Sequence, residues 1–263
     1  MGQKIKPTAI RIGVIKEWSS RWLPKGFRFG PLLHEDFVIR SVIMQKIKLA
    51  GVDSIVIEKT RGNYRVTIRT AKPGLIIGRG GKGVEELTTL LERSIAHLRA
   101  IRGLKEKVSL SLTIEEIKRY EVSAMVTAQQ IAWDLEKRMP FRRTIKKYLE
   151  RIMQNRDIKG AKIRVSGRLD GAEIARAEQL TLGSLPLQTL RANIDYAEGT
   201  AFTTYGTIGI KVWLYKGQIV GTTKEVSAQT RDLQIPRRSA PRPSHADGAR
   251  HPRSTNTHRT PRS

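Results

Sequence analysis

Leu75-Ile76-Ile77-Gly78-Arg79-Gly80-Gly81-Lys82-Gly83-Val84 is the stretch of sequence that decides the fold. It holds a literal G-x-G-x-x-G pattern at Gly78, Gly80 and Gly83. A dinucleotide-binding fold requires this pattern directly after a strand, with an acidic residue about 20 positions further on. Here a Pro-Gly break comes before the glycines, and residues 98–103 contain no acid. Lys82 is followed by glycine rather than by Ser or Thr, so the stretch is not a P-loop either.

The same stretch fits a second pattern, Ile-Gly-x-x-Gly between two helices, which is the signature of a KH domain. Glycines let the chain turn tightly and leave no Cβ in the way of a sugar-phosphate backbone. The N-terminus of the following helix offers free N–H donors and a positive dipole, and a KH module clamps about four nucleotides in this way. A glycine connection with only a structural purpose is the alternative. RNA-binding is predicted for Gly78, Arg79, Gly80, Gly81 and Lys82.

The elements around the loop are predicted from hydrophobic periodicity and from turn residues. We expect a helix over 35–50, strands over 52–58 and 64–70, a short helix over 75–77, a helix over 83–102 and a strand over 108–114. This order matches the type II KH arrangement. Residues 35–115 are therefore expected to form a KH domain, with a three-stranded sheet and helices on one face.

The second half, residues 116–220, is expected to be a separate α/β domain with two helices and a mixed or antiparallel sheet. The predicted elements are helices over 121–139 and 141–154, a strand over 161–168, a short helix over 171–178, and strands over 188–196 and 204–216. The whole chain is thus predicted to be α+β.

The two ends of the chain are basic. Residues 1–34 interleave cations with aromatic residues, which suits either an arm that lies on the folded domain or an arm that threads into RNA. Residues 221–263 hold nine Lys or Arg, three Asp or Glu and no aromatic residue. Such a segment buries too little apolar surface to offset chain entropy, so a disordered tail is expected.

Charge narrows the class of partner. The 263 residues carry 49 Lys or Arg against 24 Asp or Glu, a net charge of +25. An excess of this size favours an anionic partner, and nucleic acid is favoured over a membrane because no apolar run is long enough to span one. The chain has no cysteine, and its five histidines are irregularly spaced, so we expect no metal site, no cofactor and no catalytic centre.

A strongly basic helix is predicted just after Pro140. The pairs Arg142/Lys146 and Arg143/Lys147 are spaced i,i+4 and share one cationic face, with Arg138 shortly before them. Like charges at this spacing repel each other, and a solvated helix would normally mix in acids. We therefore predict that this face binds RNA, although an ordinary exposed face remains the alternative.

Taken together, these motifs resemble the bacterial small-subunit ribosomal protein three family, from residue 1 to about 220. The resemblance rests on Met1-Gly2-Gln3-Lys4, on Ile76-Ile77-Gly78-Arg79-Gly80-Gly81 and on Phe141-Arg142-Arg143. It rests most specifically on Val165-Ser166-Gly167-Arg168-Leu169 with Gly171-Ala172-Glu173-Ile174-Ala175-Arg176, and continues through Thr204-Tyr205-Gly206. One departure is Ser184, which stands where the family usually has an arginine.

The resemblance implies a structural role in the head of the small ribosomal subunit, bound to 16S rRNA beside ribosomal proteins ten and fourteen. It also implies a place at the channel through which mRNA enters, with proteins four and five as further candidate neighbours, where Arg142, Arg143 and Lys146 assist the unwinding of structured mRNA. Candidate rRNA-binding residues are Lys4, Lys6, Arg11, Lys16, Trp22, Arg164, Arg168, Arg176 and Arg191. The rival hypotheses are a free KH regulator of RNA and an enzyme, for which the sequence offers no catalytic arrangement.

Overall fold

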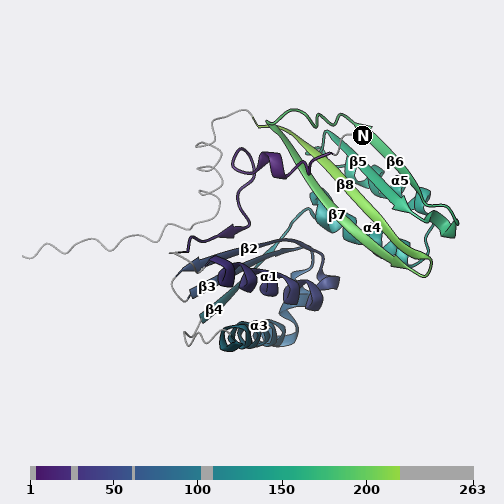
Figure 1. The fold of residues 1–263 in the computed structure, drawn as a ribbon. Coiled ribbons are helices and arrows are strands. Elements are labelled where there is room, and N and C mark those ends of the chain that lie inside the picture. Colours follow the sequence, from purple (N-terminus) through teal and green to yellow (C-terminus); the bar gives the residue numbers. More distant parts are fainter. Residues whose placement is uncertain (1–3, 25–28, 61–62, 102–108, 220–263) are drawn as a thin grey trace, which may run out of the picture. The chain divides into compact units, whose positions relative to one another are not determined.

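The computed structural model describes residues 4–24, 29–60, 63–101 and 109–219. They form two β-sheets, and helices pack against each of them (Figure 1). The disorder predicted for 221–263 lies outside the described residues. Among the described residues, no helix is both long and apolar enough to cross a membrane.

The first sheet has the strand order β1-β2-β3-β4. Strands β2 (Val52–Thr60) and β3 (Asn63–Thr70) run antiparallel, and β4 (Ser109–Glu116) joins β3 in parallel. Helices α1 (Phe29–Lys46) and α3 (Lys82–Ile101) share one core with this sheet (Figure 1). The core draws on Ile39 and Ile43 from α1 and on Leu87, Leu91 and Ile95 from α3. The predicted KH elements are thus confirmed.

The predicted three-stranded sheet gains a short fourth strand from the N-terminal arm. Strand β1 (Ser20–Arg21) pairs in parallel with β2. Arg40 of α1 fixes it there, because its guanidinium donates to the Ile55 carbonyl of β2 (2.7 Å) and to the Ser19 carbonyl (3.1 Å). This strand could not be predicted from the sequence, since two residues are too few to show any periodicity.

Short helical turns connect the longer elements of this sheet. The 3₁₀ turn η3 (Lys48–Ala50) follows α1, and α2 (Pro73–Ile77) follows β3. A further 3₁₀ turn, η4 (Arg79–Gly81), leads directly into α3. Helix α1 begins at Phe29, earlier than the predicted residue 35.

The second sheet is antiparallel throughout, in the order β6-β5-β8-β7. Its strands are β5 (Gly160–Gly167), β6 (Arg176–Gly183), β7 (Ala192–Thr203) and β8 (Gly206–Gln218). After the 3₁₀ turn η5 (Tyr120–Val122), helices α4 (Ala124–Glu136) and α5 (Phe141–Met153) lie on the same side of this sheet (Figure 1). Together they close the larger of the two main cores.

The helix predicted over 171–178 is wrong. A 3₁₀ turn, η6 (Leu169–Gly171), ends there, and β6 begins at Arg176. The segment is rich in Ala and Glu, which favour a helix locally. Eight residues of β6 pair with β5 instead, and this ladder outweighs the local preference. The error matters because β6 carries Glu178, which contacts the basic helix.

The N-terminal arm lies on the folded protein at its first turn, η1 (Ala9–Arg11). Arg11 is fully buried. Its guanidinium donates to the carbonyls of Ala192 (2.9 Å), the first residue of β7, and of Leu187 (2.8 Å) and Thr189 (2.9 Å), which precede that strand. For this part of the arm, the first of the two sequence interpretations is correct.

Candidate nucleic-acid interface

The glycine loop is a tight turn between α2 and α3. Gly78, Gly80 and Gly81 adopt the positive φ angles of 68°, 63° and 81° that glycine tolerates best. A Cβ on Gly83 would lie 2.4 Å from the Ile76 carbonyl oxygen, so the two helices approach too closely for any larger residue. The loop therefore presents bare backbone next to the N-terminus of α3.

The two cations of the loop are available to a ligand. Arg79 and Lys82 are both exposed, and neither forms an ion pair within the described part of the chain. Helix α3 begins at Lys82, so its first unpaired N–H groups lie at the loop. Backbone donors, a helix dipole and two free cations together suit a phosphate group.

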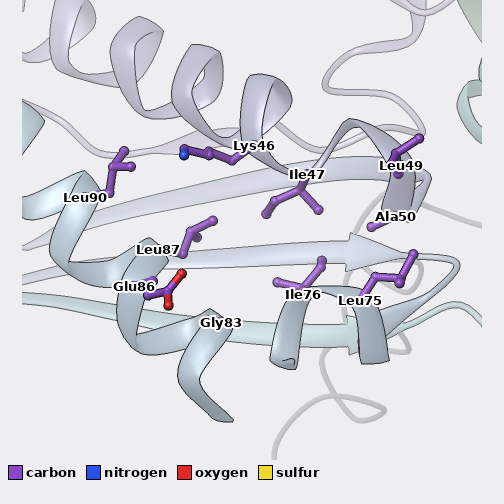
Figure 2. Close-up of a pocket in the computed structure, with 10 residues that line it drawn as sticks. All are labelled: Lys46, Ile47, Leu49, Ala50, Leu75, Ile76, Gly83, Glu86, Leu87 and Leu90. Atoms are coloured by element: carbon purple, nitrogen blue, oxygen red, sulfur yellow. The ribbon is translucent and has the colours of Figure 1, made fainter. Parts of the chain in front are cut away.

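An open groove of about 310 Å³ lies behind the loop, between η3, α2 and α3 (Figure 2). Its lining is mostly aliphatic, and Lys46 and Glu86 contribute one charge of each sign. Because these charges cancel, the groove gives no electrostatic preference for phosphate. It is distinct from the backbone surface of the glycine loop, although Gly83 belongs to both.

Helix α5 separates apolar and cationic residues onto opposite faces. The predicted apolar face is buried, and it consists of Phe141, Ile145, Tyr148, Leu149 and Ile152. Arg142, Arg143, Lys146 and Lys147 are exposed on the other face. Within the described residues, Arg143 and Lys147 form no ion pair, and Lys146 has only Glu150 at 3.9 Å.

Arg142 has an acidic partner that the sequence did not reveal. Its Nε and Nη2 donate to the two carboxylate oxygens of Glu178 in β6, at 3.0 and 2.9 Å. The hydrogen bond from Arg142 holds the pKa of Glu178 below its ordinary value, and the same bond raises the pKa of Arg142. Arg176 of β6 also approaches Glu178, at 3.9 Å. The pair keeps the carboxylate charged and orients Arg142 along the sheet edge.

Arg138 lies outside the basic helix. Helix α4 ends at Glu136, and Arg138 adopts a positive φ of 60° in the turn before α5. Its backbone N–H donates to the Leu135 carbonyl (2.9 Å), so the turn caps α4. The side chain is exposed beside the start of α5, where it adds to the positive charge.

Three candidates from the arm, Arg11, Lys16 and Trp22, have buried or half-buried partners within the protein. Arg11 is a correction to the predicted rRNA-binding set, because it is buried and its donors are used by backbone carbonyls. Lys16 forms an ion pair with Asp195 (2.7 Å). Trp22 donates its indole N–H to Asp36 (2.8 Å), so its polar edge faces inward. Structural roles therefore occupy a part of the arm that sequence reasoning assigned to RNA.

The other rRNA-binding candidates also include one residue with partners inside the protein and several that are exposed. Arg168 donates to the carbonyls of Ala172 (2.8 Å) and Tyr205 (3.3 Å), so it closes the loop before β6. The remaining candidates are exposed, and they are Lys4, Lys6, Arg164, Arg176 and Arg191. Lys6 pairs with Glu198 at 3.2 Å, in a contact that is open to solvent.

A buried ionic cluster joins α1 and α3 to the first sheet, and the sequence did not suggest it. Lys59 reaches Asp36 (2.6 Å), while Arg99 Nε donates to Glu35 (2.8 Å). Tyr64 donates its hydroxyl to Glu35 (2.6 Å), and burial raises the pKa of this phenol well above its ordinary value. Each cation of the cluster is paired with a carboxylate inside the protein, so the cluster is structural rather than a ligand site.

Comparison with known proteins agrees with this geometry. A family model described as KH domain matches residues 38–122, and one described as Ribosomal protein S3, C-terminal domain matches residues 131–214. Small ribosomal subunit protein uS3 of Clostridium novyi is 46% identical over 224 residues, which cover 85% of this chain and 96% of that protein. The uS3 protein of Alkaliphilus oremlandii is 42% identical over 234 residues, covering 89% of this chain and 93% of that protein. The chain therefore belongs to the small ribosomal subunit protein uS3 family.

Proposed function

We propose that this chain binds the rRNA of the small ribosomal subunit and contacts mRNA through helix α5. As a member of the uS3 family, it is a structural component of the small subunit and not an enzyme. Small-subunit ribosomal proteins of this family work in the cytoplasm. Its proposed protein neighbours are ribosomal proteins ten and fourteen, with proteins four and five near the path of the mRNA.

The cationic face of α5 is the observation that carries the mRNA contact. Arg143 and Lys147 repel each other at i,i+4 spacing, and no acid in the described chain neutralises either of them. Burial of the opposite face fixes the rotation of the helix, so these cations must point outward. A helix held in this orientation suits a polyanion that passes over it, because each neutralised phosphate releases counterions.

The proposed mechanism needs no nucleotide hydrolysis by this protein. Lysine and arginine side chains on α5 hold the phosphates of separated mRNA strands while the ribosome moves the message. The contacts are to the backbone, so they do not depend on base sequence. Arg142 has a carboxylate partner in Glu178, and it exchanges that partner for a phosphate when RNA is present.

The rRNA contact is proposed for two other surfaces. One is the glycine loop, where bare backbone, the N-terminus of α3 and the cations Arg79 and Lys82 come together. The other consists of exposed cations outside the loop, namely Lys4, Lys6, Arg164, Arg176 and Arg191. Arg11, Lys16, Trp22 and Arg168 support these surfaces through contacts within the protein.

A triple variant tests the role of α5. Replacing Arg142, Arg143 and Lys146 by Ala removes three exposed cations and leaves the buried face of the helix intact. We expect the variant to assemble into small subunits normally. Translation through mRNA hairpins should slow, while translation of unstructured messages should keep its rate. The measurement is the elongation rate on matched messages with and without a stable hairpin.

The matched control replaces three exposed cations elsewhere, Arg93, Lys118 and Arg156, by Ala. It removes the same charge, and it should translate both messages at the wild-type rate. Equal rates for the α5 variant on structured and unstructured messages would contradict the proposed mRNA contact. Slowing on both messages alike, in both variants, would point to general charge loss and contradict it too.

A further inference from the structure

We propose that the uncovered face of the second sheet is an RNA-binding surface, on which Lys162, Arg164 and Lys211 hold the phosphates of an rRNA segment. The proposal rests on the rRNA binding proposed above and extends it from Arg164 alone to a whole face of the sheet, with Lys162 and Lys211 as new members. Helices α4 and α5 cover one face of the sheet (Figure 1), and these three cations belong to the other face. Neither α4 nor α5 covers this second face, and Leu185 and Leu187 pack only on one end of it, against Ala192, Ile194 and Tyr215.

Strand alternation decides which residues lie on the uncovered face. In β5, Ala161, Ile163 and Val165 are fully buried in the core beneath the helices. Successive side chains of a strand point to opposite faces, so Lys162 and Arg164 point away from that core. Lys211 stands directly opposite Arg164 in the register, and it is therefore on the same uncovered face.

The register places two cations side by side at the centre of the sheet. Strands β5 and β8 are the two inner strands, and Arg164 pairs with Lys211 across them. Directly opposite residues of an antiparallel pair have Cβ atoms about 4.5–5.5 Å apart, and like charges at that position repel. Gln179 of β6 stands opposite Arg164, and Glu198 of β7 stands opposite Lys211, so the four side chains form one row across the sheet. Glu198 contacts Lys211 from the other side at 3.8 Å, so Arg164 is the member of the pair that is left for an external anion.

The protein's own acids neutralise only part of the charge on this face. Within the described residues, neither Lys162 nor Arg164 forms an ion pair. Glu198 is the acid of the row, and it is shared between Lys211 (3.8 Å) and Lys6 (3.2 Å). Tyr196 also donates its hydroxyl to Glu198 (2.6 Å). One shared carboxylate against four cations leaves a clear excess of positive charge.

The neighbouring rows favour RNA over an acidic protein as the occupant. One adjacent row holds Trp213 and Tyr196, whose ring centroids are 5.2 Å apart, with the ammonium of Lys162 5.7 Å from the Trp213 ring. The other adjacent row pairs Ser166 with Gly209, whose small size lets a bulky backbone approach the sheet. Aromatic rings beside cations are the groups on which RNA bases stack while phosphates are held.

Salt dependence of rRNA binding tests the proposal. The probe is in vitro transcribed small-subunit rRNA, and the protein is the full chain. The face variant K162Q/R164Q/K211Q should bind about tenfold more weakly or worse at low salt. Its plot of log K against log salt should be shallower by about 2, because each single-strand phosphate contact contributes about 0.7 to the slope. The control variant R93Q/K118Q/R156Q loses the same charge and should keep the wild-type slope.

Folding of the face variant is checked by its melting temperature in the absence of RNA. It should stay close to that of the wild type, because removing the repulsion between Arg164 and Lys211 offsets the loss of the solvent-exposed contact between Lys211 and Glu198. A fall of many degrees would show that these side chains stabilise the fold and would contradict the proposal that they are kept for RNA. Loss of binding without loss of stability supports an RNA contact on this face.

The outcomes separate this inference from the proposed function. If the wild-type chain itself fails to bind small-subunit rRNA, the proposed function is wrong. If the wild type binds and the face variant keeps the wild-type slope, the inference alone is overturned. An equal fall in slope for the face and control variants would also overturn it. Unchanged rRNA binding with loss of the variant from assembled subunits would indicate a protein occupant instead.

Discussion

Single residues of the same type have different partners in this chain. Arg11 and Arg143 are both arginines within basic stretches, yet one is buried among backbone carbonyls and the other is exposed. Sequence patterning identified both as RNA contacts, because it registers charge and not burial. Only the fold shows that the carbonyls of residues leading into β7 surround Arg11. Charge near the ends of a chain is therefore weak support for a contact until burial is known.

Asp195 should make stability depend on pH. Its carboxylate contacts Lys16 (2.7 Å) and Lys216 (3.5 Å) and accepts from the Ala124 N–H (3.2 Å) at the start of α4. Burial by itself raises the pKa of Asp195, but the two lysines outweigh it and hold this pKa below its ordinary value. The stabilising effect is therefore complete above about pH 4 and is lost as the pH falls through the lowered pKa.

Replacing Asp195 by Asn should cost about 1–3 kcal/mol of unfolding free energy at pH 7, because charged hydrogen bonds are lost. The difference from the wild type should shrink as the pH falls below the ordinary pKa of Asp, about 4, and through the lowered pKa of Asp195. Urea denaturation at several pH values measures both quantities. A difference that stays constant from pH 7 to pH 2 would show that the charge of Asp195 does not matter.

Two glycines of the loop region should respond differently to Ala. At Gly83 a Cβ would lie 2.4 Å from the Ile76 carbonyl oxygen, so Gly83→Ala must push α2 and α3 apart. At Gly80 a Cβ meets nothing within 4 Å, and only the positive φ of 63° is unfavourable. We expect Gly80→Ala to cost about 1–2 kcal/mol and Gly83→Ala to cost more. Thermal unfolding compares them, and equal losses would contradict the close helix approach.

At the scale of elements, the sequence predicted the helices and strands that show a hydrophobic periodicity. It did not predict the elements that depend on pairing with a distant strand. The amphipathic helices α3 and α5 and the alternating strand β3 were predicted close to their observed limits. Strand β6 was predicted as a helix, because its register with β5 is a long-range property without a local signal. The Arg142–Glu178 pair was missed for the same reason.

Glu178→Gln should strengthen the binding of RNA to α5. The change removes the carboxylate that holds Arg142 and leaves a side chain of the same shape. Both side chains are accessible to solvent, so the melting temperature should not change. The slope of log K against log salt for an RNA hairpin should steepen by about 0.7–0.9, the value of one more phosphate contact.

The control for this variant is Glu150→Gln, which removes the same charge from α5 itself. Glu150 contacts Lys146 only at 3.9 Å, so its loss releases no firmly held cation. The Glu150 variant should change the slope less than the Glu178 variant. If both variants behave alike, Glu178 has no specific hold on Arg142.

At the scale of the molecule, the KH signature and the second-half motifs were enough to predict the family and an α+β fold. They did not predict how the N-terminal arm is used. Its Ser20 and Arg21 extend one sheet, while Arg11 and Lys16 contact the residues of β7 and those just before it. These contacts connect residues about 180 positions apart, so only the assembled fold reveals them. All the proposed RNA surfaces are rich in Lys and Arg, in line with the net charge of +25 on the whole chain.

Sedimentation of the full chain with ribosomal subunits tests the central claim most directly. The chain is expressed in growing cells, and the lysate is separated on a gradient at high salt, which removes proteins that are only loosely bound. A structural protein of the small subunit should remain in the small-subunit peak at one copy per rRNA. Recovery only in the free-protein fractions would contradict the claim.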